Sequence, residues 1–249
     1  MTATFEKTAP ESALTMFEAE VEGLAELRAA DEIRVLDVIE CGTRDGRSYL
    51  ILERLALEPA TDATARSLGR QLANLHRHTK ARFGWHRDNT IGQTPQRNGW
   101  SDDWVRFFRE ERLGFQIELA LHNGHDLSRD GACLGARLPE LFEGYRPQPS
   151  LLHGDLWGGN WGSVNGEPVV FDPAVYYGDR ESDIAMTRLF GGFGRGFYEA
   201  YEASWPLAPG HERRLLLYQL YHVLNHLNLF GTSYLARAKA LLHQLLQTL

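Results

Sequence analysis

Apolar side chains recur at helical spacing along much of this chain. One such stretch covers residues 12–29, where a single face carries Phe17, Val21 and Leu24. A second begins after a capping residue, Thr61 or Asp62, and its apolar face carries Ala65, Leu68, Leu72 and Leu75. Helices are also predicted from the cap Ser101 towards residue 124, less distinctly from there to about residue 145, and over 212–230 and 234–249. The chain beyond its first quarter should therefore be mainly helical.

Short runs of β-branched and aromatic residues interrupt the helical pattern. The predicted strands cover residues 33–39, 49–52, 151–153, 161–164 and 169–172. A turn-like stretch at 42–46 joins the first two into a hairpin, and Asn165-Gly166 marks a second hairpin by the strongest short turn signal. Residues 83–100 are rich in glycine and are expected to be loop. The pattern predicts an α+β fold of two lobes with the functional site between them.

Composition narrows the class of protein. The chain has 249 residues, is 43% hydrophobic and carries a net charge of −7, which is ordinary for a globular protein. It contains no block of Lys and Arg, so nucleic-acid binding is not expected. No run reaches the roughly 18 apolar residues of a membrane span, and the N-terminus lacks the apolar run of a signal peptide. With only Cys41 and Cys133 present, a cytoplasmic location is predicted.

The main chemical signal is the run His153-Gly154-Asp155-Leu156-Trp157-Gly158-Gly159-Asn160. In a kinase catalytic loop, an Asp accepts the proton of the attacking hydroxyl, and an Asn five positions later helps to hold Mg²⁺. Asp172 follows at the end of the next hairpin and offers a second oxygen ligand for the metal. Asp, Asn and Gly are also common turn residues, so the spacing alone could mark a simple turn. The preceding strand, the hairpin and Asp172 together favour phosphoryl transfer.

A kinase also needs a cation on the nucleotide phosphates, and Lys7 is the candidate, at the end of a short possible strand. Its partner should be a helical carboxylate, and Glu20 borders the apolar face of the first helix more closely than Glu18 or Glu22. A solvated lysine near the chain end is the alternative interpretation. Residues 50–55 are expected to form a strand that leads into a connector between the lobes.

Several stretches together resemble the fructosamine kinases, also called ketosamine kinases. The most specific are LLHGDLWGGNWG and FDPAVYYGDRESDIAM, supported by MFEAEVEGL, LHRHT, FGWHRDNTIGQTPQRNGW and LYQLYHVLNHLNLFG. The similarity extends from about Phe5 to Leu246, and Trp157 is its most particular mark because related aminoglycoside and choline kinases share the loop only loosely. The resemblance implies a protein-kinase-like fold and ATP-dependent phosphorylation of the sugar part of a ketosamine, free or on a glycated protein. The phosphorylated adduct then breaks down and releases the amine.

Carried over by position, the resemblance implies a role for each candidate residue. Asp155 is the catalytic base, Asn160 and Asp172 hold Mg²⁺, and Lys7 with Glu20 forms the phosphate-binding pair. The adenine connector is Arg54-Leu55-Ala56, and substrate contacts are expected from His153, Trp157 and Asp179. Asp179, Arg180 and Asp183 could instead form ion pairs that hold the loop after Asp172. His222 and His226 have a zinc-ligand spacing, but packing or substrate contact is the favoured interpretation.

One departure from the family pattern concerns the N-terminus. Only six residues precede Lys7, none of them glycine, and the run 191–196 lies too late to replace a glycine-rich turn over the phosphates. The expectation is a partial N-lobe at residues 1–56 and a helical C-lobe at residues 57–249. The favoured function is a ketosamine kinase that uses ATP and Mg²⁺. The alternatives are a catalytically impaired binding protein for a nucleotide or glycated amine, and a kinase of another amino sugar or amino alcohol.

Overall fold

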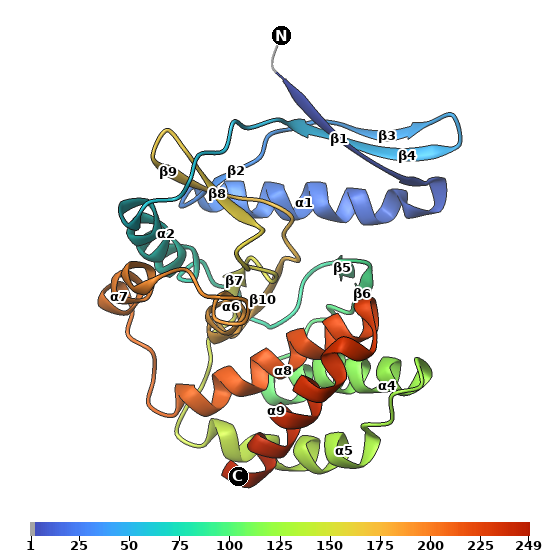
Figure 1. The fold of residues 1–249 in the computed structure, drawn as a ribbon, viewed down its shortest axis with the longest axis vertical. Coiled ribbons are helices and arrows are strands. Elements are labelled where there is room, and N and C mark those ends of the chain that lie inside the picture. The colour runs from blue at the N-terminus through green and yellow to red at the C-terminus, as the bar shows by residue number, and fades with distance from the viewer. Residues whose placement is uncertain (1–2) are drawn as a thin grey trace.

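The computed structural model describes residues 3–249, and its first part is a three-stranded antiparallel sheet backed by one helix (Figure 1). The strands lie in the order β1-β4-β3, and their bounds are β1 Thr4–Pro10, β3 Val38–Arg44 and β4 Arg47–Glu53. Helix α1, Leu14–Ala30, follows a 3₁₀ turn at Glu11–Ala13 and lies against the sheet. It buries Phe17 and Leu24 but leaves Val21 half-buried, so the predicted stripe is largely confirmed.

The hairpin predicted in this region is present with different bounds. The turn is only Asp45-Gly46, and both residues have positive φ values of 52° and 72°, as a tight two-residue hairpin turn requires. The strand predicted over residues 33–39 is wrong as a single element. Its first part is β2, Arg34–Val35. This strand does not join the N-terminal sheet but pairs in parallel with β9 in the later half of the chain. A boundary between lobes at residue 56 stays a prediction.

The second hairpin carries the middle of the chain. Strands β8, Trp161–Val164, and β9, Glu167–Val170, turn through Asn165 and Gly166, which have φ values of 53° and 79°. β2 extends this pair into a three-stranded sheet. Strand β7, Ser150–Leu152, was predicted, whereas its partner β10, Tyr176–Gly178, was not. Three-residue strands such as β10 are too short to show an alternating pattern.

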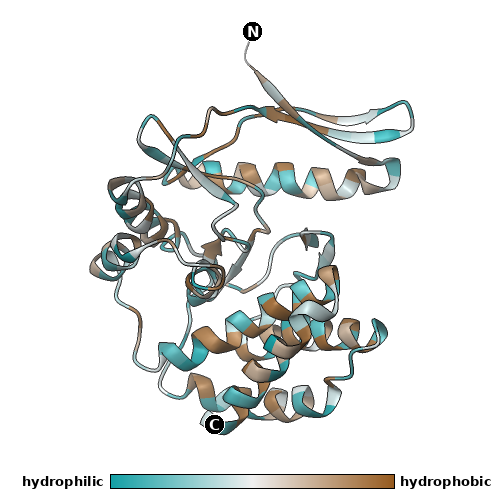
Figure 2. Cartoon of the chain, viewed as in Figure 1, coloured by the Kyte–Doolittle hydropathy of each residue, from teal (hydrophilic) through white to brown (hydrophobic). Residues whose placement is uncertain are grey.

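Helices form the remainder of the fold. Their bounds are α2 Asp62–Leu75, α3 Trp104–Phe107, α4 Phe115–His122, α5 Ser128–Arg137, α6 Glu181–Thr187, α7 Arg195–Ser204, α8 His211–Phe230 and α9 Leu235–Thr248. A 3₁₀ turn at Leu138–Phe142 and another at Thr232–Tyr234 extend this set. Helix α2 is capped by Thr61, whose Oγ1 accepts the Thr64 N–H at 3.1 Å. Figure 2 shows hydrophobic and hydrophilic positions mixed on the lower helices, as expected for amphipathic packing.

Two predictions on the middle helices are wrong. Ser101 does not cap the helix before Trp104; the cap is Asp103, whose carboxylate accepts the Arg106 N–H at 3.0 Å. The helix that follows is also not uniform, because Phe108–Gly114 has π-helical hydrogen bonding. The stretch expected to be loop contains a small hairpin of β5, Asn89–Ile91, and β6, Thr94–Gln96. Among residues 3–249, no helix combines the length and apolar character needed to cross a bilayer.

Helices α2 and α7 pack at a point where only a glycine fits. A Cβ at Gly69 would lie 2.3 Å from the Phe197 carbonyl oxygen. In an open helix, Gly→Ala stabilises by up to about 1 kcal/mol, but here the two backbones would have to separate. We expect Gly69→Ala to lower the free energy of unfolding by about 1–3 kcal/mol, measured by chemical denaturation. Gly99→Ala is the control, since its Cβ would meet nothing within 4 Å; equal effects of the two substitutions would contradict this packing.

Candidate active site

The loop after β7 turns sharply so that Asp155 faces a cavity. Gly154 has a φ of 83°, and a Cβ there would lie 2.0 Å from the Ala174 carbonyl oxygen. Only glycine can therefore bring the loop this close to the segment that follows β9. The Ala174 N–H donates to the His153 carbonyl at 2.8 Å and closes the same contact from the other side.

A buried carboxylate fixes the backbone of this loop. Asp183, in α6, is fully buried and accepts the N–H of His153 at 2.8 Å and of Gly154 at 2.9 Å. His76 Nε2, at the end of α2, lies 3.2 Å from the same carboxylate. Burial alone would raise the pKa of Asp183, but the hydrogen bond and charge of His76 hold the pKa below its ordinary value. Asp183 was expected to hold this region through ion pairs; it does so through two backbone N–H groups as well as through its contact with His76.

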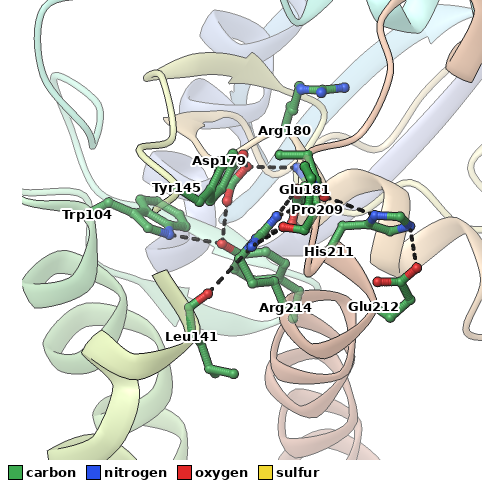
Figure 3. A network of polar contacts seen from close by, with 12 residues as sticks. Trp104, Leu141, Tyr145, Asp179, Arg180, Glu181, Pro209, His211, Glu212 and Arg214 are labelled. Carbon is green, nitrogen blue, oxygen red and sulfur yellow. Dashed lines mark hydrogen bonds and ion pairs between the residues drawn. The ribbon is translucent and has the colours of Figure 1, made fainter. Parts of the chain in front are cut away.

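His153 and Asp179 do not reach the cavity. His153 is 1% exposed, and its Nε2 bonds to the Phe171 carbonyl at 3.1 Å. Asp179 is 0% exposed and accepts hydrogen bonds from the hydroxyls of Tyr145, at 2.8 Å, and Tyr218, at 2.6 Å (Figure 3). The predicted substrate contacts are therefore not compatible with the burial of either side chain. Trp157, by contrast, is 39% exposed and lines the cavity.

The network around Asp179 joins the start of α6 to α8. Arg214 of α8 donates two hydrogen bonds to Glu181, at 2.8 and 2.9 Å, as Figure 3 shows. Trp104 Nε1 donates to the Tyr218 hydroxyl at 3.0 Å, which places this tryptophan in the core. These buried contacts hold α6, and through it Asp183, in a fixed position relative to α8.

Asp155 and Asn160 contact each other directly. Asn160 Nδ2 lies 2.9 Å from the Asp155 carbonyl oxygen, 3.3 Å from the Asp155 carboxylate and 3.4 Å from the Asp172 carbonyl oxygen. Burial raises the pKa of Asp155 to about 7, and the negative charges of Asp172 and Asp183 add to the rise. A carboxyl group with this pKa is suited to accept a proton near neutral pH.

Lys7 bridges the two parts of the molecule. It lies within β1, and its Nζ is 2.6 Å from the Glu20 carboxylate in α1 and 2.6 Å from the Asp172 carboxylate. Glu20 is thus the partner that the helical phase indicated, whereas Glu22 pairs with His86 and Arg87. Burial lowers the pKa of the Lys7 ammonium, but the charges of Glu20 and Asp172 outweigh it and leave the pKa above its ordinary value.

These side chains line one cavity of about 330 Å³. Its walls come from α1, from the β5–β6 hairpin and from the C-terminal half of α8, together with Lys7, Asp155, Trp157, Asn160 and Asp172. The hairpin is held in place by Asn89, which donates to the Val175 carbonyl at 2.8 Å, and by Gln96, which donates to the Ala174 carbonyl at 3.1 Å. For α8, the sequence offered packing or substrate contact for His222 and His226; His226 does line the cavity, whereas the part taken by Asn225, Leu229 and Phe230 was not predicted, because nothing local in the sequence shows which residues face Asp155.

A second, more apolar cavity of about 230 Å³ adjoins the first at Asp172. It lies beside the predicted connector, and its apolar lining residues are Phe5, Leu36, Leu52, Leu55, Leu57 and Phe171. Within the connector, Arg54 and Leu55 line the cavity, whereas Ala56 is not among its lining residues. The Arg54 N–H already donates to the Ala3 carbonyl at 2.9 Å, so its amide is not free for a ligand.

The oxygen atoms near Asp172 fit a hard cation that is completed by a ligand. Asn160 uses its Nδ2 towards Asp155, and its Oδ1 accepts no hydrogen bond from residues 3–249. Over the same described residues, no group of three or more His, Cys, Asp or Glu side chains could hold a metal by itself. Mg²⁺ is commonly bound by one or two protein oxygens together with substrate phosphates. Asn160 and Asp172 match that donor set.

Comparisons with known proteins identify the class to which this site belongs. A sequence model of the family described as fructosamine kinase matches residues 1–248, so the chain belongs to the fructosamine kinase family. Aminoglycoside phosphotransferases share only the fold, which is protein-kinase-like; one of them superposes with a TM-score of 0.62 at 14% identity, over 98% of this chain and 87% of its own.

Three individual relatives are similar over most of their length. A Synechocystis sp. protein assigned as a ketoamine kinase is 46% identical over 93% of this chain and 79% of its own length. The protein-ribulosamine 3-kinase of Arabidopsis thaliana is 42% identical over 98% of this chain and 76% of its own. A solved structure from Haemophilus somnus, assigned as a fructosamine-3-kinase, superposes with a TM-score of 0.92 at 32% identity, covering 97% of this chain and 83% of its own.

The raised pKa of Asp155 makes a prediction about stability. A carboxyl group has a pKa near 3.9 in an unfolded chain, so its contribution to stability is fully present below that pH and is lost as the pH rises through about 7. Asp155→Asn removes this ionisation. We expect it to raise the free energy of unfolding at pH 8 by up to about 4 kcal/mol relative to its effect at pH 4, measured by urea denaturation. Asp130→Asn, at an exposed position in α5, is the control; a pH-independent effect at both positions would contradict the assignment.

Proposed function

We propose that this chain transfers the γ-phosphoryl group of ATP to a hydroxyl on the sugar part of a ketosamine. The observation that carries the proposal is the convergence of Asp155, Asn160, Asp172 and Lys7 on one cavity, with Asp155 poised as a base. Membership of the fructosamine kinase family supports it. Because phosphoryl transfer depends mainly on positioning and electrostatics, a rigid set of these four groups is what the reaction requires.

The residues divide the work as follows. Asp155 orients the acceptor hydroxyl and takes its proton as the oxygen attacks phosphorus. Asn160 and Asp172 would hold Mg²⁺, which when bound supplies positive charge to the phosphate oxygens. Lys7 has Asp172 as its partner without nucleotide, and the phosphates are proposed to replace that contact while Glu20 keeps the ammonium in position.

The adenine is proposed to occupy the apolar cavity beside Leu55. This cavity adjoins, at Asp172, the cavity that Asp155 lines, which is called the acceptor cavity because it is proposed to hold the acceptor. An apolar cavity suits a purine ring, and main-chain groups of the connector are proposed to orient the ring. Since the Arg54 N–H is already bonded to Ala3, the N–H and carbonyl groups of Leu55 and Ala56 are the better candidates for the adenine contacts.

The acceptor is proposed to be a ketosamine such as a ribulosamine or fructosamine adduct, free or on a protein. The names of the Synechocystis and Arabidopsis relatives, a ketoamine kinase and a protein-ribulosamine 3-kinase, support this substrate class. Phosphorylation would make the adduct unstable, so that the amine is regenerated. The cytoplasm remains a prediction for this chain, and the Arabidopsis relative is named as chloroplastic.

Replacing the base separates catalysis from nucleotide binding. We expect Asp155→Asn to lower kcat for ribuloselysine phosphorylation by about 10²–10⁴-fold, the usual contribution of a positioned general base. The affinity for ATP should change little, because the nucleotide is held by the connector, Lys7 and the metal ligands. Steady-state kinetics and calorimetric ATP binding test this in parallel, with Asp130→Asn as control. Near-normal turnover in Asp155→Asn would reduce Asp155 to a turn residue, and ATP binding without any turnover in the wild type would favour the non-catalytic binding protein.

Removing the Asp172 carboxylate should make nucleotide binding independent of the metal. Asp172 and the Asn160 Oδ1 are the two protein oxygens proposed for Mg²⁺. Without Asp172 only one protein ligand is left, which is too few to hold the ion. We expect Mg²⁺ to strengthen ATP binding in the wild type and to have no effect in Asp172→Ala, as measured by calorimetry with and without the ion. Equal ATP affinities in the wild type under both conditions would refute the metal assignment.

A further inference from the structure

His226 of helix α8 lines the acceptor cavity, and a hydrogen bond to the helix backbone fixes the tautomer of its ring. His226 Nδ1 lies 2.8 Å from the carbonyl oxygen of His222, one turn earlier in the same helix. A carbonyl oxygen can only accept a hydrogen bond, so Nδ1 carries the hydrogen. Burial lowers the pKa of His226; the hydrogen bond to the His222 carbonyl raises it and the positive charge of Arg237 lowers it, and the net shift is downward, which favours the neutral ring. Its Nε2 is therefore a hydrogen-bond acceptor.

The acceptor atom has no hydrogen-bond partner among residues 3–249. His226 lines the cavity that contains Asp155. Among residues 3–249, its only hydrogen bond is the one made by Nδ1. With Nδ1 tied to the helix, Nε2 is the polar atom that the ring can offer to a ligand in the cavity. His226 is only partly buried, and a ligand in the cavity that donates an N–H or O–H can bond to this atom.

Three aromatic rings lie beside His226. Its ring centroid lies 4.8 Å from that of Phe190, 5.4 Å from Phe230 and 5.2 Å from Tyr234. Aromatic faces attract cations, and quaternary or alkylated ammonium groups are recognised in this way. Among the charged residues that line the cavity, Glu20 and Asp172 pair with Lys7, and Asp155 is the carboxyl group outside these ion pairs.

From these observations we infer that His226 recognises the amine of the ketosamine, with Nε2 accepting a hydrogen bond from the substrate's secondary ammonium group beside Phe230. The inference rests on the proposed function and adds the residue that distinguishes a ketosamine from a nitrogen-free sugar. Asp155 acts on the hydroxyl, whereas His226 acts on the nitrogen, so two residues that line the same cavity contact two different groups of the acceptor.

The test compares two acceptors that differ only in the linking group: ribuloselysine and its ether analogue, in which oxygen replaces the amine nitrogen. His226→Phe keeps an aromatic ring but removes the acceptor nitrogen, and His226→Gln restores an acceptor near the Nε2 position. We expect His226→Phe to reduce the preference for ribuloselysine, as the ratio of the two kcat/KM values, by about tenfold to a hundredfold, the range of a hydrogen bond to a charged group. His226→Gln should recover part of it. Tyr234→Phe is the matched control, because it keeps a ring against His226.

Calorimetric titration of each folded variant with ribuloselysine provides a second readout that needs no turnover, and thermal unfolding shows whether each variant is intact. An active wild type whose preference survives His226→Phe, or a loss that is equal for both acceptors, would overturn this inference alone. A wild type that phosphorylates neither acceptor and binds no ribuloselysine would overturn the proposed function, and this inference with it.

Discussion

The buried carboxylate of Asp183 is the interaction on which the site depends. It accepts two consecutive backbone N–H groups of the catalytic loop, so the position of Asp155 is set by a charge that no solvent reaches. A charge in this environment is tolerated only when it is fully hydrogen-bonded. His76 completes it, and His76 is in turn contacted by the hydroxyl of Tyr201 from α7 at 2.8 Å. Helices α2, α6 and α7 therefore position the loop together, although none of them enters the cavity.

The second constraint joins the N-terminal sheet to the rest of the molecule. Lys7 reaches Asp172 across 165 positions of sequence, and Glu20 fixes the same ammonium from α1. Without nucleotide, this arrangement pairs the charges that phosphates and a metal would otherwise meet. The two contacts of Lys7 differ in exposure: the Asp172 side chain is about half exposed, whereas that of Glu20 is only 14% exposed. A ligand can therefore replace Asp172 as a partner of Lys7 more easily than it can replace Glu20.

The sequence was sufficient for those parts of the site that are encoded locally. The spacing of Asp155 and Asn160, the Asn165-Gly166 turn and the helical phase of Glu20 each depend on residues within one element or one loop. The structure places Asp155, Asn160 and Glu20 in the cavity and forms the turn as predicted. It was not sufficient for contacts made by distant residues. Nothing near His76 indicates that it meets Asp183, 107 positions later. Asp179 is of a residue type that is common in active sites, but tyrosines from other segments of the chain bury it. The short strands β2 and β10 owe their existence to their partners and leave no pattern of their own.

The most direct test of this account is phosphoryl transfer by the unmodified chain. The protein would be incubated with ATP and Mg²⁺ and, in separate reactions, with ribuloselysine, fructoselysine, an aminoglycoside and choline, and each acceptor would be analysed by mass spectrometry for an added phosphate. The account predicts phosphate on one or both ketosamines and none on the aminoglycoside or on choline. Phosphate on the amino sugar or amino alcohol alone, or ATP binding without transfer to any acceptor, would contradict it.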